Sequence, residues 1–223
     1  MDYSHIAGTE LFAGATPAET ESMLGCLGAE QRDYPRGSVL YRMGEPVTSL
    51  GLVLSGSVNI ESIDLWGNRS ILDSIGPGQV FAETYTCLPR EPLMVDVTAA
   101  EDCRVLFLGT ARILQTCPSA CAHHSRLIRN LMAISARKNL ALSRKILHTT
   151  PKTIRGRLIS YLSFQAAQQG GRRFDIPFNR QQLADYLGVD RSALSGELSR
   201  MQADGLLTFR KNHFELRELD WRP

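Results

Sequence analysis

The chain has 223 residues, of which 43% are apolar and 22% are charged, and this composition excludes an intrinsically disordered protein. No apolar run is long enough to span a membrane and no signal peptide opens the chain, so we expect a cytoplasmic protein without a membrane partner. The five cysteines are odd in number and irregularly spaced, which excludes a secreted disulfide framework.

The net charge of +2 conceals an uneven distribution along the chain. Up to residue 112 there are seven Lys and Arg against 15 Asp and Glu, whereas from residue 113 onward there are 18 against eight. A basic half joined to an acidic half indicates a nucleic-acid-binding module linked to a part that does not contact nucleic acid.

The first predicted element is a short helix over residues 16–28. Thr16 suits its N-cap, Pro17 the first helical position and Glu19 the capping-box position. The apolar residues of its inner face are Met23, Leu24 and Leu27. This pattern indicates a helix that packs one side against the domain that follows.

Residues 31–110 contain short apolar or alternating runs that are separated by glycine and proline turns. The runs cover residues 38–42, 50–56, 57–65, 69–75, 95–100 and 104–109. Trp66, Gly67 and Asn68 lie between two of them and are typical of a hairpin turn. Strands of this length and spacing predict an antiparallel β-roll of the double-stranded β-helix or jelly-roll type.

A long helix is predicted over residues 119–147, which contain neither proline nor glycine. One apolar stripe consists of Leu127, Leu131, Ile134 and Ala141. The adjacent stripe consists of Ile128, Met132, Leu142 and Ile146. A helix of about eight turns is too long to bury itself on a small roll alone, which favours a coiled-coil-like dimer seam. The alternative is a helix that folds back across its own domain.

The rest of the chain predicts a winged helix-turn-helix. Thr150-Pro151 ends the long helix, an amphipathic helix then runs to Gly170-Gly171, and residues 172–178 form a short strand or turn. The next helix has one apolar face, made by Leu183, Ala184 and Leu187. Gly188 suits a turn that needs positive φ, and Asp190 is a good N-cap for a second helix.

The second helix of this motif has a buried and an exposed face. Its apolar stripe consists of Leu194, Leu198 and Met201. Its other face carries Arg191, Ser192, Ser195, Ser199 and Arg200, which are short or cationic. Residues 206–216 then form two short strands around a tight loop, with Arg210 and Lys211 near its tip.

The order of roll, long helix and winged helix-turn-helix resembles the Crp/Fnr family of bacterial transcription regulators. The resemblance rests on RGSVLYRMGEPVTSLGLVLSGSVNI, GPGQVFAE and FNRQQLADYLGVDRSALSGEL. It implies an α+β chain with a cyclic-nucleotide-binding-like effector domain over residues 1–112, a dimerisation helix over residues 113–147 and a DNA-binding domain over residues 148–223. It further implies a homodimer on a near-palindromic double-stranded DNA site, with RNA polymerase as another partner.

In this family the second helix enters the major groove. By resemblance, Arg191 aligns with an arginine that contacts either a base or a phosphate, and Ser192 and Ser195 are the other candidate base contacts. Gly196 stands where many members carry a second reading arginine, so the usual half-site is not carried over. The candidate phosphate contacts, which position the protein without specifying sequence, are Arg180, Gln181, Arg200, Arg210 and Lys211.

The effector position departs from that of cyclic-AMP-binding members. Glu83 matches the glutamate of their Gly-Glu pair, but Ala82 stands in the glycine's place, and Leu93 and Met94 occupy the Arg-Ser places. Because a cyclic phosphate there would lack its charge partner, we expect no tight cyclic AMP binding, and the effector and any cofactor are unknown. The expected lining of a retained pocket is Glu83, Thr84, Tyr85, Leu93, Met94, Val95, Lys138 and Asn139.

Two cysteines and two histidines, Cys117, Cys121, His123 and His124, fall close together at the start of the long helix. They could hold zinc or a haem iron or act as a redox pair, although their spacing matches no standard zinc motif. The alternative is small apolar cysteines beside solvent-facing histidines. The sequence has no recognised catalytic motif, so we expect no enzyme. A roll that binds no ligand and serves only for dimerisation or polymerase contact is a further alternative.

Overall fold

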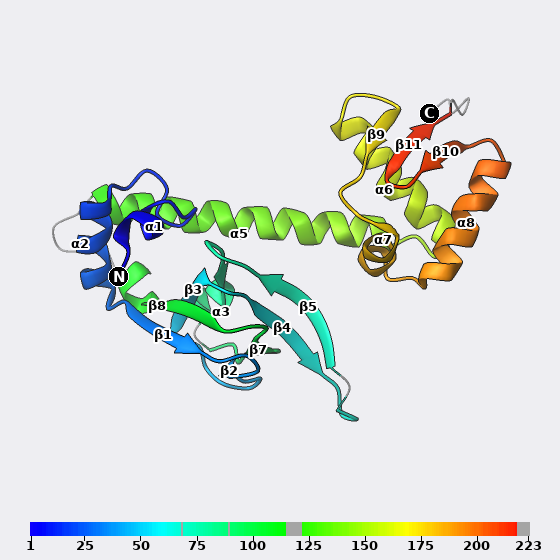
Figure 1. The fold of residues 1–223 in the computed structure, drawn as a ribbon. Helices are drawn as coiled ribbons and strands as arrows, with labels where there is room; N and C mark the ends of the chain where they lie inside the picture. Colours follow the sequence, from blue (N-terminus) through cyan, green and yellow to red (C-terminus); the bar gives the residue numbers. More distant parts are fainter. Residues whose placement is uncertain (68, 89, 115–121, 218–223) are drawn as a thin grey trace. The chain divides into compact units, whose positions relative to one another are not determined.

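The computed structural model describes residues 1–67, 69–88, 90–114 and 122–217, and Figure 1 shows the helices and strands along the chain. Packing separates two compact units, Met1–Arg137 and Lys138–Pro223. Each unit has a hydrophobic core of its own. Among the described helices, none combines the length and the apolar character that crossing a membrane requires.

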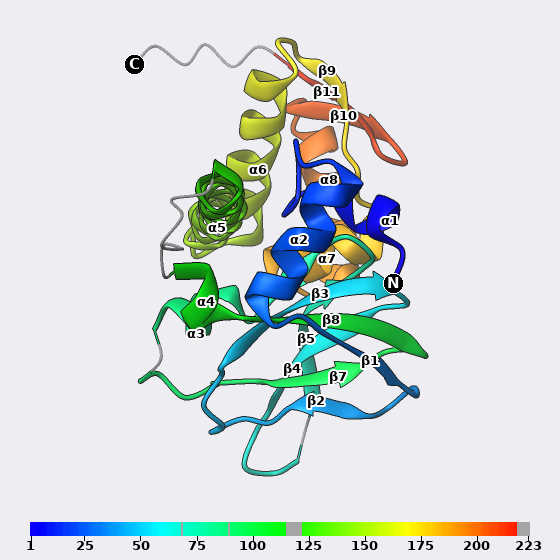
Figure 2. The same ribbon diagram turned by 90° about the vertical axis from the view of Figure 1, so that its left-hand side faces the viewer.

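Two four-stranded antiparallel sheets form the centre of the first unit, which confirms the predicted roll. The first sheet has the order β1 (Glu30–Tyr34), β8 (Cys103–Gly109), β3 (Ser49–Ser55) and β6 (Val80–Phe81). The second has the order β2 (Val39–Tyr41), β7 (Asp96–Ala99), β4 (Val58–Ile63) and β5 (Arg69–Ile75). All six predicted runs contain a strand, and β4 and β5 pair as a hairpin. Figure 2 shows the first sheet layered on the second.

The two central strands of the first sheet, β8 and β3, are buried on both faces, which explains why they are continuous apolar runs. Leu50 and Leu52 of β3 face a cluster shared with the helices of this unit, whereas Val53 faces the interior of the roll. Gly51 lies between Leu50 and Leu52 in β3, and its lack of a side chain leaves room for the ring of Phe81. A Cβ at residue 51 would approach the Phe81 Cζ to 2.1 Å. The glycine is therefore required by packing.

The helix predicted over residues 16–28 is α2 (Pro17–Leu27). Its capping box is confirmed, because the Glu19 amide donates to Thr16 Oγ1 at 3.2 Å and the Thr16 amide donates to Glu19 Oε2 at 2.8 Å. The predicted inner face, Met23, Leu24 and Leu27, is buried against the first sheet.

Five short elements of the first unit were not evident from the sequence. They are α1 (Tyr3–Ala7), β1, β6, α3 (Glu83–Cys87) and α4 (Thr110–Leu114). Strand β1 is the clearest case, because its sequence EQRDY is polar and no side chain in it is fully buried. It forms through backbone pairing with β8, from Glu30 opposite Phe107 to Tyr34 opposite Cys103.

The long helix is α5 (Ala122–Thr149), and its two predicted stripes have different surroundings. Leu127, Leu131 and Ile134 are buried in the core of the first unit, so this stripe packs within its own domain, as the alternative required. Ala141, at the end of this stripe, is exposed. Of the second stripe, Ile128 is half-buried against the same core, whereas Met132, Leu142 and Ile146 are 66%, 62% and 65% exposed. One face of α5 is therefore packed within the chain, and the other leaves large apolar side chains exposed.

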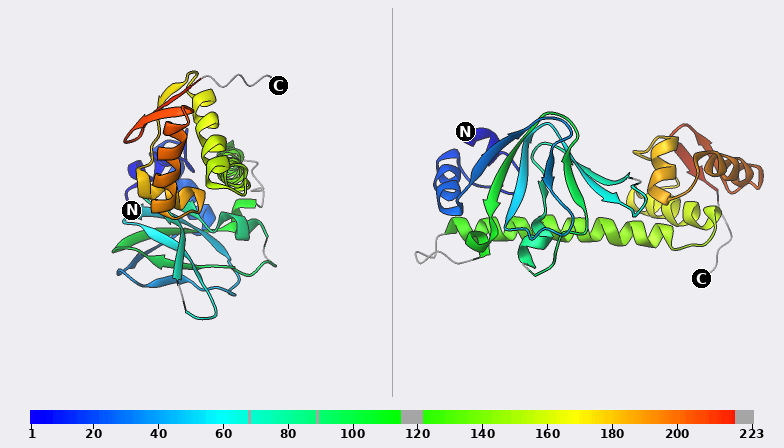
Figure 3. Two further views of the ribbon diagram at one scale, coloured as in Figure 1. Left: turned by 90° about the vertical axis from the view of Figure 1, so that its right-hand side faces the viewer. Right: turned by 90° about the horizontal axis from the view of Figure 1, so that it is seen from below.

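The second unit contains the predicted helix-turn-helix and hairpin, and the segment predicted as a short strand or turn adds a third strand to the hairpin. After α5 it contains α6 (Ile154–Gln168), β9 (Arg173–Asp175), α7 (Arg180–Leu187), α8 (Arg191–Ala203), β10 (Leu207–Arg210) and β11 (His213–Leu216). The sheet order is β10-β11-β9, and both views of Figure 3 show it beside the helices. The side chains at its centre, which include Leu158, Leu183, Leu194 and Phe214, are fully buried.

Candidate nucleic-acid interface

The junction between α7 and α8 fixes the direction of the second helix. Asn179 and Gln182 form a capping box at the start of α7, and Gly188 ends that helix at a φ of +63°. Asp190 then caps α8, where its carboxylate accepts from the Ala193 amide at 2.9 Å. Hydrogen bonds from the Ser192 hydroxyl and the Ala193 amide lower the pKa of Asp190, so the cap is charged at neutral pH.

The outer face of α8 carries short side chains above a buried stripe. Leu194, Leu198 and Met201 are 0–2% exposed, as predicted. Arg191, Ser192 and Gly196 are exposed, and Ser195 is half-buried. The Ser195 hydroxyl donates to the Arg191 carbonyl at 3.0 Å. A Cβ at Gly196 would meet no atom within 4 Å, so the surface is open at this position and the backbone of α8 is accessible to another molecule.

A buried carboxylate on α8 was not foreseen from the sequence. The side chain of Glu197 is only 11% exposed, and Oε1 accepts from Arg155 Nε of α6 at 2.6 Å. Its other oxygen accepts from Arg200 Nε at 2.9 Å, and Arg155 also pairs with Asp204 Oδ2 at 2.8 Å. The hydrogen bonds from Arg155 and then Arg200 lower the pKa of Glu197. Arg155 therefore positions α8, and Arg200 is already engaged by a carboxylate.

Arg180 has a role at the base of the wing. Its guanidinium lies 5.0 Å from the centre of the Phe209 ring and donates to the Lys211 carbonyl at 3.1 Å. Burial lowers the pKa of Arg180 from its usual value. Gln181 donates to Asp185 Oδ1 at 2.8 Å. The arrangement ties α7 to the hairpin while the Arg180 side chain stays half-buried.

The tip of the wing carries two exposed cations. Arg210 ends β10, and Lys211 follows it at a φ of +56°, in the left-handed region. The tight turn, with Asn212 completing it, brings both side chains out of the sheet. Such exposed cations suit contact with phosphate oxygens, because a phosphate contact requires a positive charge on a side chain long enough to reach the DNA backbone.

The predicted effector residues of the roll have unequal surroundings. Glu83 and Leu93 are buried, at 5% and 2% exposure, whereas Met94 is 73% exposed. The Leu93 carbonyl accepts from the Gly44 amide at 2.7 Å, and the Met94 amide donates to the Tyr85 hydroxyl at 3.4 Å. Thr84 is exposed, and Tyr85 and Val95 are half-buried. Lys138 and Asn139 belong to the second unit, so their part in a pocket of the roll remains a prediction.

Ala82 precedes Glu83 and has a φ of +62°, in the region that favours glycine. Ala82 therefore stands at a position whose backbone conformation suits glycine, the residue that the cyclic-AMP-binding members carry there. Leu93, which the resemblance aligns with the family's arginine, is a buried apolar side chain.

Of the cysteine and histidine candidates, Cys117 and Cys121 lie outside the described residues. His123 Nδ1 lies 3.5 Å from Glu19 Oε1, and His124 is buried at 7% exposure. Within residues 1–67, 69–88, 90–114 and 122–217, no three His, Cys, Asp or Glu side chains are grouped to hold a metal ion.

Two family profiles match the chain. The cyclic nucleotide-binding domain matches residues 31–119, and the Crp-like helix-turn-helix domain matches residues 156–221. The cyclic AMP receptor protein of Thermus thermophilus is 27% identical over 213 residues, which cover 95% of this chain and 94% of that protein. The CRP-like protein Clp of Xanthomonas euvesicatoria is 26% identical over 190 residues, 80% of each chain.

Solved structures show the same fold. The crystal structure of the Thermus thermophilus catabolite activator protein matches with a TM-score of 0.51 at 26% identity, over 94% of both chains. The Xanthomonas campestris regulator CLP, described as responsive to c-di-GMP, matches with a TM-score of 0.56 at 22% identity, over 92% of this chain and all of that one.

Proposed function

The chain belongs to the Crp/Fnr family of DNA-binding transcription regulators, and we propose that it works as a homodimer that reads a near-palindromic site with one α8 helix from each protomer. Members of this family are regulators and not enzymes. The observation that carries the proposal is the shallow outer face of α8, where Arg191 and Ser192 are exposed above a fully buried stripe. The proposed place of action is the cytoplasm, with RNA polymerase as a partner.

The proposed contacts fall into two classes. Arg191, Ser192 and Ser195 face the base edges, and the open surface at Gly196 lets the helix approach the groove. The phosphate contacts are Arg210 and Lys211 of the wing, with Gln181, Arg180 and Arg200. Arg200 and Arg180 are held by protein partners, so their contribution to DNA binding is smaller than that of the exposed wing cations.

The exposed stripe of α5 supports the homodimer. Met132, Leu142 and Ile146 are each more than 60% exposed, and they recur along one face of a 28-residue helix. Burial of large apolar side chains is the main source of stability in such seams, and the same stripe on a second copy is complementary to it. The two recognition helices would then enter successive major grooves about one helical turn apart.

The effector is proposed to be something other than cyclic AMP, although the Thermus thermophilus relative is named for that ligand. Leu93 is 2% exposed where the family's arginine would hold the cyclic phosphate. A phosphate buried against an apolar side chain loses its hydration without gaining a charge partner, which is costly. Calorimetry with cyclic AMP tests this, and micromolar affinity would contradict it.

The main test combines sequence selection with assembly. Double-stranded DNA that the full chain selects from a random library is expected to contain two inverted half-sites about one helical turn apart. Met132→Glu and Ile146→Glu each place a charge in the proposed seam. Sedimentation equilibrium should show that either substitution raises the dissociation constant of the dimer by at least about 100-fold.

Ala141→Glu is the matched control, because Ala141 is exposed on another face of the same helix. It is expected to remain dimeric and to select the same sites. Asymmetric selected sites, or a dimer that survives both charged substitutions in the stripe, would contradict the proposed assembly.

A further inference from the structure

Arg157 of α6 connects two other segments of the second unit. Its Nε donates to the Pro151 carbonyl at 2.9 Å, and its Nη1 donates to the Leu187 carbonyl at 2.8 Å and to the Gly188 carbonyl at 3.1 Å. Pro151 lies in the junction between α5 and α6, whereas Leu187 and Gly188 lie at the end of α7, where the chain turns toward α8. Charge-assisted hydrogen bonds from one half-buried guanidinium therefore join the junction to the turn before α8.

The acceptors at the end of α7 are carbonyls that the helix does not pair by itself. An α-helix leaves its last few carbonyls without intrahelical partners, and cations are favoured beside them. The Val189 amide bonds to the Ala184 carbonyl at 3.0 Å, one turn further back. The Arg157 guanidinium bonds to the Leu187 and Gly188 carbonyls, so it completes the end of the helix.

The junction itself packs closely against the first turn of α6. Thr153 caps α6, where its Oγ1 accepts from the Gly156 amide at 3.0 Å. A Cβ at Gly156 would approach the Pro151 Cβ to 2.9 Å, so the lack of a side chain there lets the junction lie close to the helix. The Thr150 hydroxyl donates to the Ile146 carbonyl at 2.7 Å. The chain therefore follows a defined path from the end of α5 into α6.

A second set of contacts joins the end of α5 to α6 and α7. His148, in the last turn of α5, is 1% exposed. The centre of its ring lies 5.5 Å from that of Tyr161 in α6 and 6.1 Å from that of Tyr186 in α7. Its Nδ1 lies 3.1 Å from Ser160 Oγ. The end of α5 is thus packed against the same helix that Arg157 reaches.

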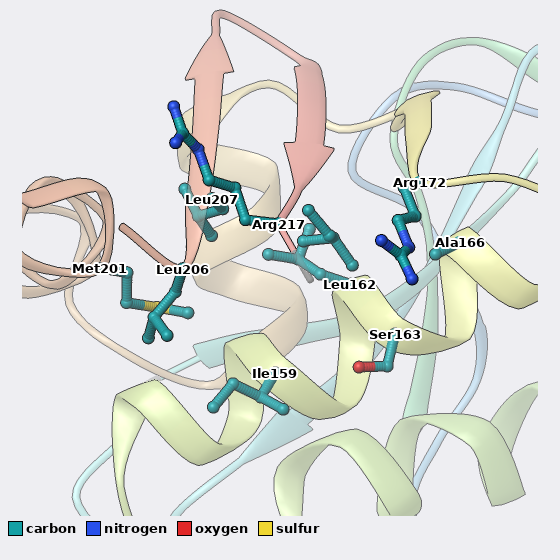
Figure 4. Close-up of a pocket in the computed structure, with 10 residues that line it drawn as sticks. Ile159, Leu162, Ser163, Ala166, Arg172, Met201, Leu206, Leu207 and Arg217 are labelled. Atoms are coloured by element: carbon teal, nitrogen blue, oxygen red, sulfur yellow. The ribbon is translucent and has the colours of Figure 1, made fainter. Parts of the chain in front are cut away.

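Helix α6 also packs against α8 and the wing. Leu162 of α6, Met201 of α8 and Leu207 of β10 line one pocket, which Figure 4 shows, and all three are 1–2% exposed. Leu142 and Ile146, which belong to the proposed seam of α5, lie in the same compact unit. The proposed seam and the helix proposed to read DNA are therefore parts of one packed body.

We propose that Arg157 is a positioning residue for DNA recognition, which sets the direction of α8 relative to the end of α5. This role rests on the proposed homodimer, because there the direction of α8 from the seam determines which half-site spacing the two protomers accept. The donors of Arg157 are directed at protein carbonyls, so it is assigned no contact with DNA. Its loss should change the spacing preference and not the affinity of one α8 helix for one half-site.

Fluorescence anisotropy of the full chain tests this role with a single half-site, the selected site, and the selected site lengthened at its centre by about two base pairs. The native chain is expected to prefer the selected spacing. Arg157→Met keeps an unbranched stem but donates no hydrogen bond, so it should reduce that preference by about tenfold or more and leave half-site affinity unchanged. Arg157→Lys retains a charged donor without the planar fork and should restore part of the preference.

Two control variants separate this role from charge and from stability. Arg217→Met removes the same charge at an exposed position of the same unit, and Phe174→Leu weakens the core where Phe174 stacks on Phe214. Both should keep the spacing preference, although circular dichroism should show a lower unfolding temperature for Phe174→Leu.

A spacing preference that survives Arg157→Met would overturn the role of Arg157. So would an equal loss of preference in Phe174→Leu, or a loss of half-site affinity in Arg157→Met as large as its loss on the selected site. A native chain that binds the half-site but shows no spacing preference would instead contradict the proposed homodimer, and the role of Arg157 with it.

Discussion

The proposed DNA contacts of the second unit and the proposed effector position of the first unit are built in different ways. Arg191, Ser192 and Ser195 lie within two turns of one helix, and their caps and buried partners lie on the same short stretch of chain. In the first unit, Glu83 and Leu93 come from separate segments that only the folded sheets bring into their places. The contrast teaches that recognition by a single helix can be read locally, whereas a pocket assembled from several strands cannot.

Leu198→Ala gives the largest expected effect and tests whether the two units are stable independently. Leu198 is 0% exposed in the core of the second unit, so its truncation leaves a cavity and should cost about 2–5 kcal/mol in that unit alone. Differential scanning calorimetry should show one transition lowered and the roll transition unchanged. Ser199→Ala, the exposed neighbour, is the control, and a joint shift of both transitions would show that the units do not unfold separately.

Arg191→Ala tests the local character of DNA recognition. Arg191 is exposed at the start of α8, so its removal should leave stability unchanged and reduce specific DNA binding by about 1–3 kcal/mol. Fluorescence anisotropy with selected and scrambled DNA measures both affinities. Arg210→Ala should instead weaken the two DNAs equally, as expected for a phosphate contact. Equal weakening by Arg191→Ala would contradict its assignment to the bases.

Much of the fold could be predicted because its signals are short-range. The apolar runs of the roll, the capping box of α2 and Gly188 between α7 and α8 were all identified from neighbouring residues. Strand β1 could not be, because its sequence is polar and its pairing partner β8 lies far along the chain. Tertiary pairing there outweighs local preference.

The candidate site shows the same limit. The sequence carries no signal for the pairing of Glu197, because only the fold brings Arg155, 42 residues away, to its carboxylate. Arg180 was assigned to phosphate from its charge, and only the fold shows its guanidinium over Phe209. Spacing identifies which face of a helix is exposed, but it does not identify the partners of a charged group.

Glu197→Gln tests this long-range support. The pKa of Glu197 is lowered in the folded state, so its stabilising effect is complete above its unfolded pKa of about 4.3 and is lost as pH falls through the folded pKa. The variant should cost the second unit about 1–2 kcal/mol at pH 7, because an amide accepts weaker hydrogen bonds from Arg155 and Arg200. Urea titrations of the native chain and the variant at pH 7 and pH 3 measure the difference in their free energies of unfolding.

The difference between native chain and Glu197→Gln should shrink at the lower pH, because Glu197 is then protonated in the unfolded chain and folding has to release that proton to keep the two arginine pairs. Glu21→Gln, on an exposed face of α2, should change stability little at either pH. A cost that is the same at pH 3 as at pH 7 would show that the charge of Glu197 contributes nothing.

Ala82→Gly gives the smallest expected effect and separates two features of the effector position. Ala82 has a φ of +62°, which costs an L-residue about 1 kcal/mol, so glycine should stabilise the roll by about that amount. Ala193→Gly, in the right-handed helix α8, should destabilise the second unit by a similar amount. Chemical denaturation measures both. Because Leu93 is proposed to stand in the place of the family's arginine, Ala82→Gly should not confer cyclic AMP binding. Tight binding by this variant would show that backbone geometry at residue 82, and not the missing cation, excludes the nucleotide.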